Sequence, residues 1–424
     1  MRRRLPAIVW WLGLVSFLND AASEMVLPLL PALVTGVLGG TALTVGQIEG
    51  TATLVGSVFK YGGGWLADRS RKHGPLVVAG YALSNVVRPL AAVVATPAGL
   101  LAMRVADRLG KGMRTAPRDT MIAQSTPAED RAAAFSVHRA LDHAGTILGA
   151  GLAVVLVSGL GWGVPAVFAA SAVPGVLVVV AAVVAIRKDV PPSAVPSAPL
   201  FPSRPPAQPG RAWSLGAGRP LLPLLAAITL SRLGLASELF LLLFAGRFVP
   251  LWGVPVLWGA LHVVKTVASL GSALVVRRVG SRGLVAAGWS MHAMVFGGFA
   301  LAAIRWDAVF AGSAQAGLVG AATRSLAVPE GAVVAILCLF CAWGLYAGLC
   351  EGAEKDLVVA RAKMGKEGGT FGLYHLLTGV AALPASVGFG WTWDNYGPAV
   401  AFGAGSALAA VAAAFLVVTP LNRR

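Results

Sequence analysis

Charged residues are scarce in this chain, and acidic ones most of all. Only 12% of the 424 residues are charged, 57% are hydrophobic, and Asp and Glu together number 18 against 34 Lys and Arg. Soluble domains carry about 25% charged residues, so this composition cannot cover a water-facing surface. The chain is therefore predicted to lie within a lipid bilayer, its main partner.

Signatures of several other protein classes are missing as well. No glycine-rich loop ends in Gly-Lys-Ser or Gly-Lys-Thr, so ATP is not expected to act directly. No Ser, His and Asp set lies on recognisable elements, so the chain is not expected to be an enzyme, and no cofactor is expected. The three cysteines fall in one apolar run (Cys338, Cys341 and Cys350), which argues against a disulfide framework.

A soft-metal site is the main alternative use of these cysteines. Met291, His292 and Met294 lie together in a neighbouring apolar run, and such ligands bind Cu(I). The two groups fall on separate predicted helices, however, and Cys and Met in apolar runs usually serve packing. No metal site is therefore expected.

The hydrophobic residues fall into runs that are long enough to cross a bilayer as helices. They are continuous rather than alternating, which favours helices over a barrel. Twelve spans are predicted: residues 8–35, 44–68, 75–95, 97–124, 132–159, 164–186, 220–249, 254–277, 283–304, 331–361, 369–392 and 397–419. The predicted fold class is an all-α polytopic membrane protein with two six-helix bundles, residues 1–186 and 220–424.

The segment 187–219 separates these two predicted bundles. It holds eight prolines and five basic residues, a composition that cannot bury a core. It is expected to be a cytoplasmic linker, because it falls on the same side as the other basic breaks between spans. By the positive-inside rule both termini are then cytoplasmic, and the net charge of +16 reflects orientation rather than nucleic-acid binding.

The N-terminus could imitate a signal peptide, because Arg2–Arg4 precede an apolar run. That run continues past Asp20 to about Val34, which is too long for a signal sequence. An uncleaved first span is expected instead.

The two halves share a short sequence at equivalent places. Ala22-Ser23-Glu24 in the first predicted span recurs as Ala236-Ser237-Glu238 in the seventh. Duplicated halves with a site between them are typical of secondary transporters.

Three motifs then carry a family resemblance. They are Gly64-Trp65-Leu66-Ala67-Asp68-Arg69 after span 2, Arg104–Gly112 in span 4, and Gly145-x-x-x-Gly149-Ala150 in span 5. Together they resemble the major facilitator superfamily over nearly the whole chain. The chain departs from the family pattern at Arg71, Arg108 and Ala150; the last stands where antiporters of the family carry proline. The resemblance implies twelve helices in two pseudo-symmetric bundles.

Finer sequence pieces resemble an uncharacterised prokaryotic branch of that family. They are Asn19-Asp20 with Ser23-Glu24-Met25, Arg114–Asp119, and Phe371–His375. This resemblance implies a prokaryotic cytoplasmic (inner) membrane and a monomer, and it implies no agreed substrate.

Ionisable side chains inside spans are costly in lipid, so each is a functional candidate. Those predicted to bind substrate or the coupling proton are Asp20, Glu24, Arg104, Arg108, Lys111, Arg232, Glu238, His262, Lys265 and Glu351. Asp20 and Glu24 lie one turn apart near mid-span, and two such carboxylates cannot both be charged at low cost. Proton coupling is predicted from this pair, and simple pairing of each with an arginine is the alternative.

Span 4 is basic along one face, since Arg104, Arg108 and Lys111 recur at spacings of three and four. Arginine binds carboxylate and phosphate groups with two hydrogen bonds, so this face suits an anionic substrate. Neutralisation by Asp20, Glu24 and Glu238 is an equally good interpretation, and the sequence leaves both open.

A second set of residues is predicted to control gating. It comprises Gly64, Asp68, Arg69, Lys72, Asp119, Arg139, Asp142 and Glu354. The resemblance implies that the motif after span 2 locks the bundles. Asp68 is expected near the N-terminus of span 11, where the helix dipole favours a carboxylate, and Arg69 or Lys72 near Asp119.

These observations predict a secondary active transporter of a small polar, possibly anionic, organic solute. Alternating access between the two bundles would be driven by protons. The alternatives are a multidrug efflux antiporter, which needs a large apolar cavity, and a transporter of siderophores or metal complexes. A non-transporting receptor is a further alternative, but it would need a signalling domain, and the longest predicted cytoplasmic segment is the linker.

Overall fold

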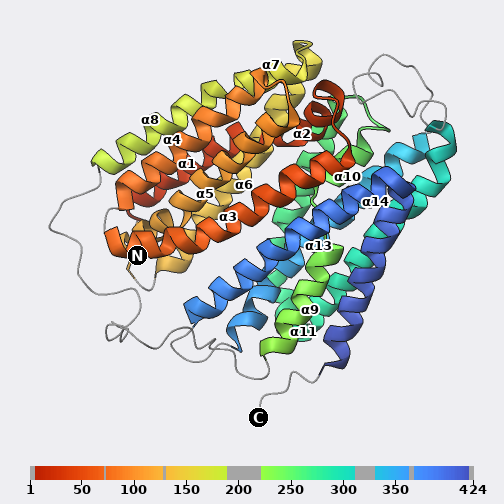
Figure 1. Ribbon diagram of the computed structural model, residues 1–424. Helices are drawn as coiled ribbons and strands as arrows, with labels where there is room; N and C mark the ends of the chain where they lie inside the picture. Colours follow the sequence, from red (N-terminus) through yellow and green to blue (C-terminus); the bar gives the residue numbers. More distant parts are fainter. Residues whose placement is uncertain are drawn as a thin grey trace.

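The computed structural model describes residues 5–70, 73–127, 130–188, 221–310, 330–361 and 367–419. These residues form helices and short connections, and none of them lies in a strand. The all-α prediction is therefore confirmed (Figure 1). The linker beyond Lys188, most of the 305–330 connection and Lys72 lie outside the described residues.

The helices of the first half agree with the predicted spans to within a few residues. They are α1 (Ala7–Glu24), η1 (Leu27–Leu29), α2 (Leu30–Ala32), η2 (Leu33–Val37), α3 (Ala42–Ser70), α4 (His73–Leu90), η3 (Ala91–Val93), α5 (Pro97–Ser125), α6 (Arg131–Val154), η5 (Val155–Gly159), α7 (Val164–Ala170) and α8 (Ala172–Lys188). The first predicted span is thus interrupted after Glu24. Pro28 and Pro31 follow there, and proline supplies no backbone N–H to a continuing helix.

The second half contains fewer but longer helices. They are α9 (Leu221–Gly234), α10 (Leu239–Ala245), α11 (Gly253–Phe310), α13 (Glu330–Val359) and α14 (Glu367–Val418). Two of them contain a sharp break at a glycine of positive φ, Gly280 at 71° in α11 and Gly397 at 85° in α14. Residues with a side chain adopt this conformation at a cost, so glycine is favoured where the chain reverses.

Nine stretches of the described residues are long and apolar enough to cross a membrane. They do not include α3 or α5, and one of them, Gly372–Val418, contains both arms of α14. The helix α5 carries seven charged residues, which explains its low apolar content. Counting α3, α5 and the two arms of α14 would give the predicted twelve, and that count stays a prediction.

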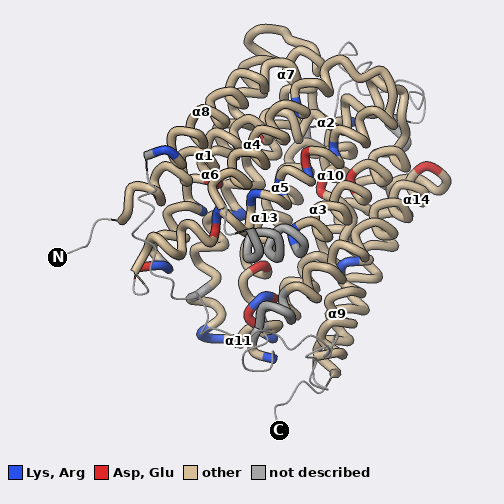
Figure 2. Tube along the Cα trace, turned by 60° about the vertical axis from the view of Figure 1, so that its left-hand side comes forward, with Lys and Arg blue, Asp and Glu red and all other residues tan. Residues whose placement is uncertain are grey.

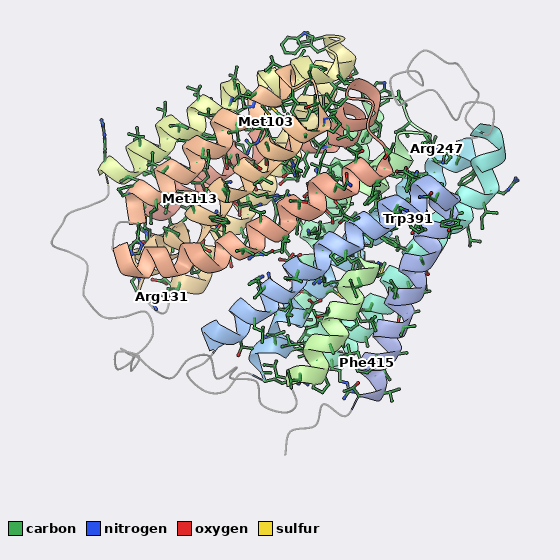
Figure 3. All side chains as sticks on the ribbon, in the orientation of Figure 1. Met103, Met113, Arg131, Arg247, Trp391 and Phe415 are labelled. Carbon is green, nitrogen blue, oxygen red and sulfur yellow. The ribbon has the colours of Figure 1, made fainter. Side chains whose placement is uncertain are left out.

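The helices of the first half lie together on one side of Figure 1, and those of the second half lie together on the other. Between them, α3 packs against α14 and α6 against α11. Figure 3 shows Arg131 and Phe415 toward the end where α1 begins and α14 ends, with Trp391 and Arg247 toward the opposite end. We call these the α1 end and the α3 end, because α3 begins near the latter.

The hydrophobic core differs between these two ends. At the α3 end one cluster is continuous across both halves, and it joins Leu29, Val34 and Val45 to Phe240 and Phe389. At the α1 end the first half has a separate cluster, which includes Ile8, Leu12, Val77, Ile122 and Val178. Among the described residues, apolar packing therefore joins the two halves at the α3 end and not at the α1 end.

The seam between α3 and α14 is also close-packed and hydrogen-bonded. A Cβ added at Gly46 would meet the backbone of Ser386, and one added at Gly390 would meet the backbone of Ala42. Beside them the carboxylate of Asp394 accepts hydrogen bonds from the backbone N–H groups of Ala42 (3.1 Å) and Leu43 (2.9 Å). These are free donors of the first turn of α3, so a residue of the second half caps a helix of the first.

Replacing Asp394 should therefore open the α3 end more often. We expect Asp394→Ala to weaken the seam by about 1 kcal/mol, the value of a partly exposed charged cap. Spin labels at Gln47 and Tyr396, in a cysteine-free background, would then report a severalfold larger population of long distances.

The matched control is Asn395→Ala, because the Asn395 amide donates only to Trp391 of its own helix. If both variants give the same distance distribution, the Asp394 contact does not hold the seam.

Candidate functional site

The arginines of α5 are held by a carboxylate that the sequence analysis overlooked. Glu49 of α3 is 6% exposed, and its two oxygens accept from Arg104 and Arg108, each at 2.5 Å. The partner is thus on span 2, not among the carboxylates of spans 1 and 7 that we considered. Glu49 is the one acidic residue within the apolar part of span 2. A lone acid inside an apolar run is costly, so the sequence could have marked Glu49 as a partner for the arginines.

The rest of the α5 charges are tied mainly to α4. Asp107 pairs with Arg88 at 3.1 Å, and it lies 3.7 Å from Arg104. Arg114 donates to the Ser84 hydroxyl at 2.6 Å. These contacts all lie within the first half, and the sequence analysis had not singled out Arg88.

Arg118 and the residues around it form a separate polar group near the α1 end. Arg118 pairs with Asp119 at 2.9 Å and donates to the Ser16 hydroxyl at 3.2 Å. Ser16 also bonds the His138 ring at 2.9 Å, and His138 lies 3.7 Å from Asp142. Asp119 and Asp142, both predicted to act in gating, thus belong to one network of α1, α5 and α6.

A similar buried pair braces the second half. Arg232 of α9 donates to Glu354 of α13 at 2.5 Å, and the Tyr374 hydroxyl of α14 donates to the same carboxylate at 2.9 Å. Glu354 is only 2% exposed. The structure therefore joins a predicted substrate residue, Arg232, to a predicted gating residue, Glu354.

One ion pair crosses between the halves toward the α1 end. Glu351 of α13 accepts from Lys355 at 2.8 Å, and it lies 3.9 Å from Arg139 of α6. Arg139 is 64% exposed, so this contact is weak and easily broken.

The repeated glutamates occupy breaks in their spans. Glu24 ends α1, and Glu238 follows the non-helical residues that separate α9 from α10. The indole N–H of Trp258 donates to Glu24 at 2.9 Å, and that of Trp343 donates to Glu238 at 3.0 Å. Across the part of the chain that the structure describes, neither glutamate forms an ion pair.

Within the described ranges, a counter-charge at contact distance is also missing for Lys60, Lys111, Lys265 and Asp20. Lys60, Lys111 and Lys265 make no ion pair there, and Asp20 accepts only from the neighbouring Asn19 amide at 3.1 Å. Lys60 and Lys111 are exposed, and Lys111 lies within electrostatic range of both Asp20 and Glu24. Figure 2 shows charged segments around the α5 and α10 labels, inside the set of helices as well as at its rim.

The motif after span 2 is only partly covered by the structure. Gly64, Asp68 and Arg69 lie in α3, but their side chains and the whole of Lys72 are outside the described residues. The predicted lock of Asp68 and Arg69 against spans 4 and 11 therefore stays a prediction.

The described residues thus separate into two groups. Arg104, Arg108 and Arg232 are neutralised inside one half. A second group, Lys111, Lys265, Glu24 and Glu238, forms no ion pair among the residues that the structure describes.

Comparison with known proteins gives the family. The Major Facilitator Superfamily model matches residues 12–386. An uncharacterized MFS-type transporter of Methanocaldococcus jannaschii is 27% identical over 98% of this chain and 95% of its own. An uncharacterized Mycobacterium tuberculosis protein is 32% identical over 34% of this chain and 36% of its own.

Solved structures share the fold at low identity. A POT family transporter in complex with 5-aminolevulinic acid is 11% identical, with a TM-score of 0.76 over 97% of this chain and 96% of its own. The nucleoside transporter NupG is 14% identical, with a TM-score of 0.71 over 97% of this chain and 99% of its own. By its sequence match over most of its length and by its fold, this chain is a membrane transporter that belongs to the Major Facilitator Superfamily.

Proposed function

We propose that this protein is a secondary active transporter that moves a small polar organic solute, with at least one anionic group, in exchange with or together with protons. The observation that carries the proposal is the contrast between the two groups of charges. Charges within the spans of a membrane protein are neutralised or functional, and the exposed Lys111 and the half-buried Lys265 have no ion pair among the described residues. They come from opposite halves, so a substrate held by both would link the halves.

The mechanism proposed is alternating access between residues 1–186 and 220–424. The continuous core at the α3 end closes one side, while the halves have separate cores at the α1 end. With both termini in the cytoplasm of a prokaryote, this is the state open to the cytoplasm. Closing the α1 end would bring Asp68 into its predicted contact with span 11. It would also break the contact of Asp394 with α3.

Proton coupling is assigned to Asp20. The groups that act on it are Asp142 of α6, Lys111 of α5 and Glu24 of its own helix, with the Asn19 amide donating to it. A proton on Asp20 would relieve its repulsion from Asp142 and Glu24, whereas an anion beside Lys111 would remove the charge that stabilises the ionised form. Binding of substrate and proton would then favour each other.

Proteoliposomes that enclose a pH-sensitive dye test the coupling without knowledge of the substrate. Addition of carboxylates, amino acids and sugar phosphates should change the internal pH for one class of solute. Asp20→Asn should abolish that change and leave solute counterflow intact, because only the proton site is lost.

Proton movement with lipophilic cations alone would favour the multidrug alternative and contradict our proposal. Movement only with ferric siderophores or metal complexes would favour the other alternative.

Structural and substrate-binding charges should differ in their effects on stability. Glu49→Gln removes the acid paired with Arg108 and the nearer of the two acids paired with Arg104, so we expect a loss of about 3–5 kcal/mol and a fall in apparent melting temperature of about 5–10 °C in detergent. Lys111→Gln removes a side chain that has no ion pair, so its melting temperature should be unchanged while transport is lost. The division of the charges is wrong if Lys111→Gln destabilises the protein as much as Glu49→Gln does.

The Asp68 motif should affect turnover rather than binding. We expect Asp68→Asn to lower the transport rate at least tenfold, with ligand affinity nearly unchanged. Val276→Ala is the control, because Val276 stands at the equivalent place in the second half, where the acidic residue of the motif is absent. Loss of affinity in Asp68→Asn would show that the motif belongs to the binding site.

A further inference from the structure

The two repeated glutamates are half-buried, and they are held in a different way from other acids of the helices. Acids such as Glu49, Asp107 and Glu354 face one or two arginines. Glu24 and Glu238 are met by neutral donors instead, namely an indole N–H for each and the Ser23 hydroxyl for Glu24. A neutral donor orients a carboxylate but leaves its charge uncompensated.

His262 lies beside these carboxylates with nothing bonded to its ring. Both of its ring nitrogens are buried, and neither has a hydrogen-bond partner among the described residues. The ring packs edge-on against Trp258 at 4.5 Å between centroids. An imidazole buried without any partner is expensive, so the site is expected to be completed by something else.

Both acidic and basic residues surround His262. Glu24, Glu238, Lys265 and His143 all lie within electrostatic range of its ring. Lys265 follows His262 by three residues on α11, so the two side chains share a helix face. The group draws on α1, α6, α10 and α11, and therefore on both halves of the protein.

Both glutamates stand at helix breaks, and both are partly exposed. Glu24 is the last residue of α1, and Glu238 stands at the start of α10 after three non-helical residues. In a membrane, irregular backbone is tolerated where it lines a cavity or is buried in protein. Interrupted helices at equivalent places in duplicated halves mark substrate sites in transporters.

We propose that these side chains bind a zwitterionic small molecule, with its ammonium group at Glu24 and Glu238 and its acid group at Lys265 and His262. The ammonium supplies the charge that both carboxylates lack. The acid group gives Lys265 its counter-ion and gives His262 a hydrogen-bond acceptor. This inference rests on the proposed transport function and narrows its substrate class from anions to zwitterions.

Through the Trp258–Glu24 hydrogen bond, such a ligand would act on the contact between the two halves. It joins α11 of the second half to α1 of the first, whereas Trp343 and Glu238 both belong to the second half. An ammonium bound at Glu24 would share this carboxylate with the indole N–H and so reinforce one of the contacts that join the halves. Ligand binding is therefore sensed directly at the junction of the halves.

Matched trios of small molecules test the inference on the purified full-length protein. The probes are alanine, propionate and propylamine, and 4-aminobutyrate, butyrate and butylamine. Only a zwitterion should raise the melting temperature or change the tryptophan fluorescence. Glu24→Gln and Glu238→Gln should each weaken its binding at least tenfold, and Lys265→Gln should do the same.

Two further variants separate a binding role from a folding defect. Trp258→Phe keeps Glu24 and the aromatic packing but removes the N–H, so we expect a loss of affinity of a few fold. Asp356→Asn is the matched carboxylate control, because Asp356 is exposed and accepts from the Ser281 hydroxyl away from this site. Its affinity for the zwitterion should equal that of the unmodified protein.

Several outcomes would overturn the inference. Equal stabilisation by propionate or butyrate, with unchanged affinity in Glu24→Gln and Glu238→Gln, would leave an anion transporter without a zwitterion site. Binding of the amines alone would assign the site to cations, and no binding by any member of either trio would exclude small zwitterions. The transport proposal itself fails if no polar solute with an anionic group moves protons in the proteoliposome assay.

Discussion

The need to neutralise charge in a low-dielectric interior governs this structure. Each buried arginine and carboxylate of the helices must find a partner or water, and most partners lie on another helix. Glu49 holds Arg104 and Arg108 between α3 and α5, and Glu354 holds Arg232 between α13 and α9. These pairs fix the packing of each half. The charged residues that are not in such pairs are the candidates for binding a ligand.

The two ends of the molecule are closed by different kinds of contact. At the α3 end the halves share one apolar core, close backbone approach and the Asp394 cap. Toward the α1 end the described cross-half ion pair is that of Arg139 and Glu351, at 3.9 Å between exposed side chains. An exposed pair contributes little to stability, so this contact holds the α1 end only weakly. The proposed alternating access would exchange the α3-end contacts for others at the α1 end.

The internal repeat has produced a symmetric fold with an asymmetric site. Ala-Ser-Glu stands at a helix break in both halves, and each glutamate accepts from an indole N–H. The first indole comes from the opposite half and the second from the same half. One copy of the motif therefore links the halves while the other remains internal, a difference that would matter in the proposed alternating access.

The sequence by itself determined the fold class, the positions of the helices and the family. Those properties depend on local signals: apolar runs, prolines such as Pro28, turn glycines such as Gly280 and Gly397, and contiguous motifs. Only the tertiary structure decided which charges are paired. Glu49 meets arginines 55 and 59 residues away, and Asp394 meets backbone 352 residues away, so no local pattern reveals either contact. Lys111 lies on the same predicted face as Arg104 and Arg108, yet packing neutralises the arginines and gives the lysine no ion pair within the described helices.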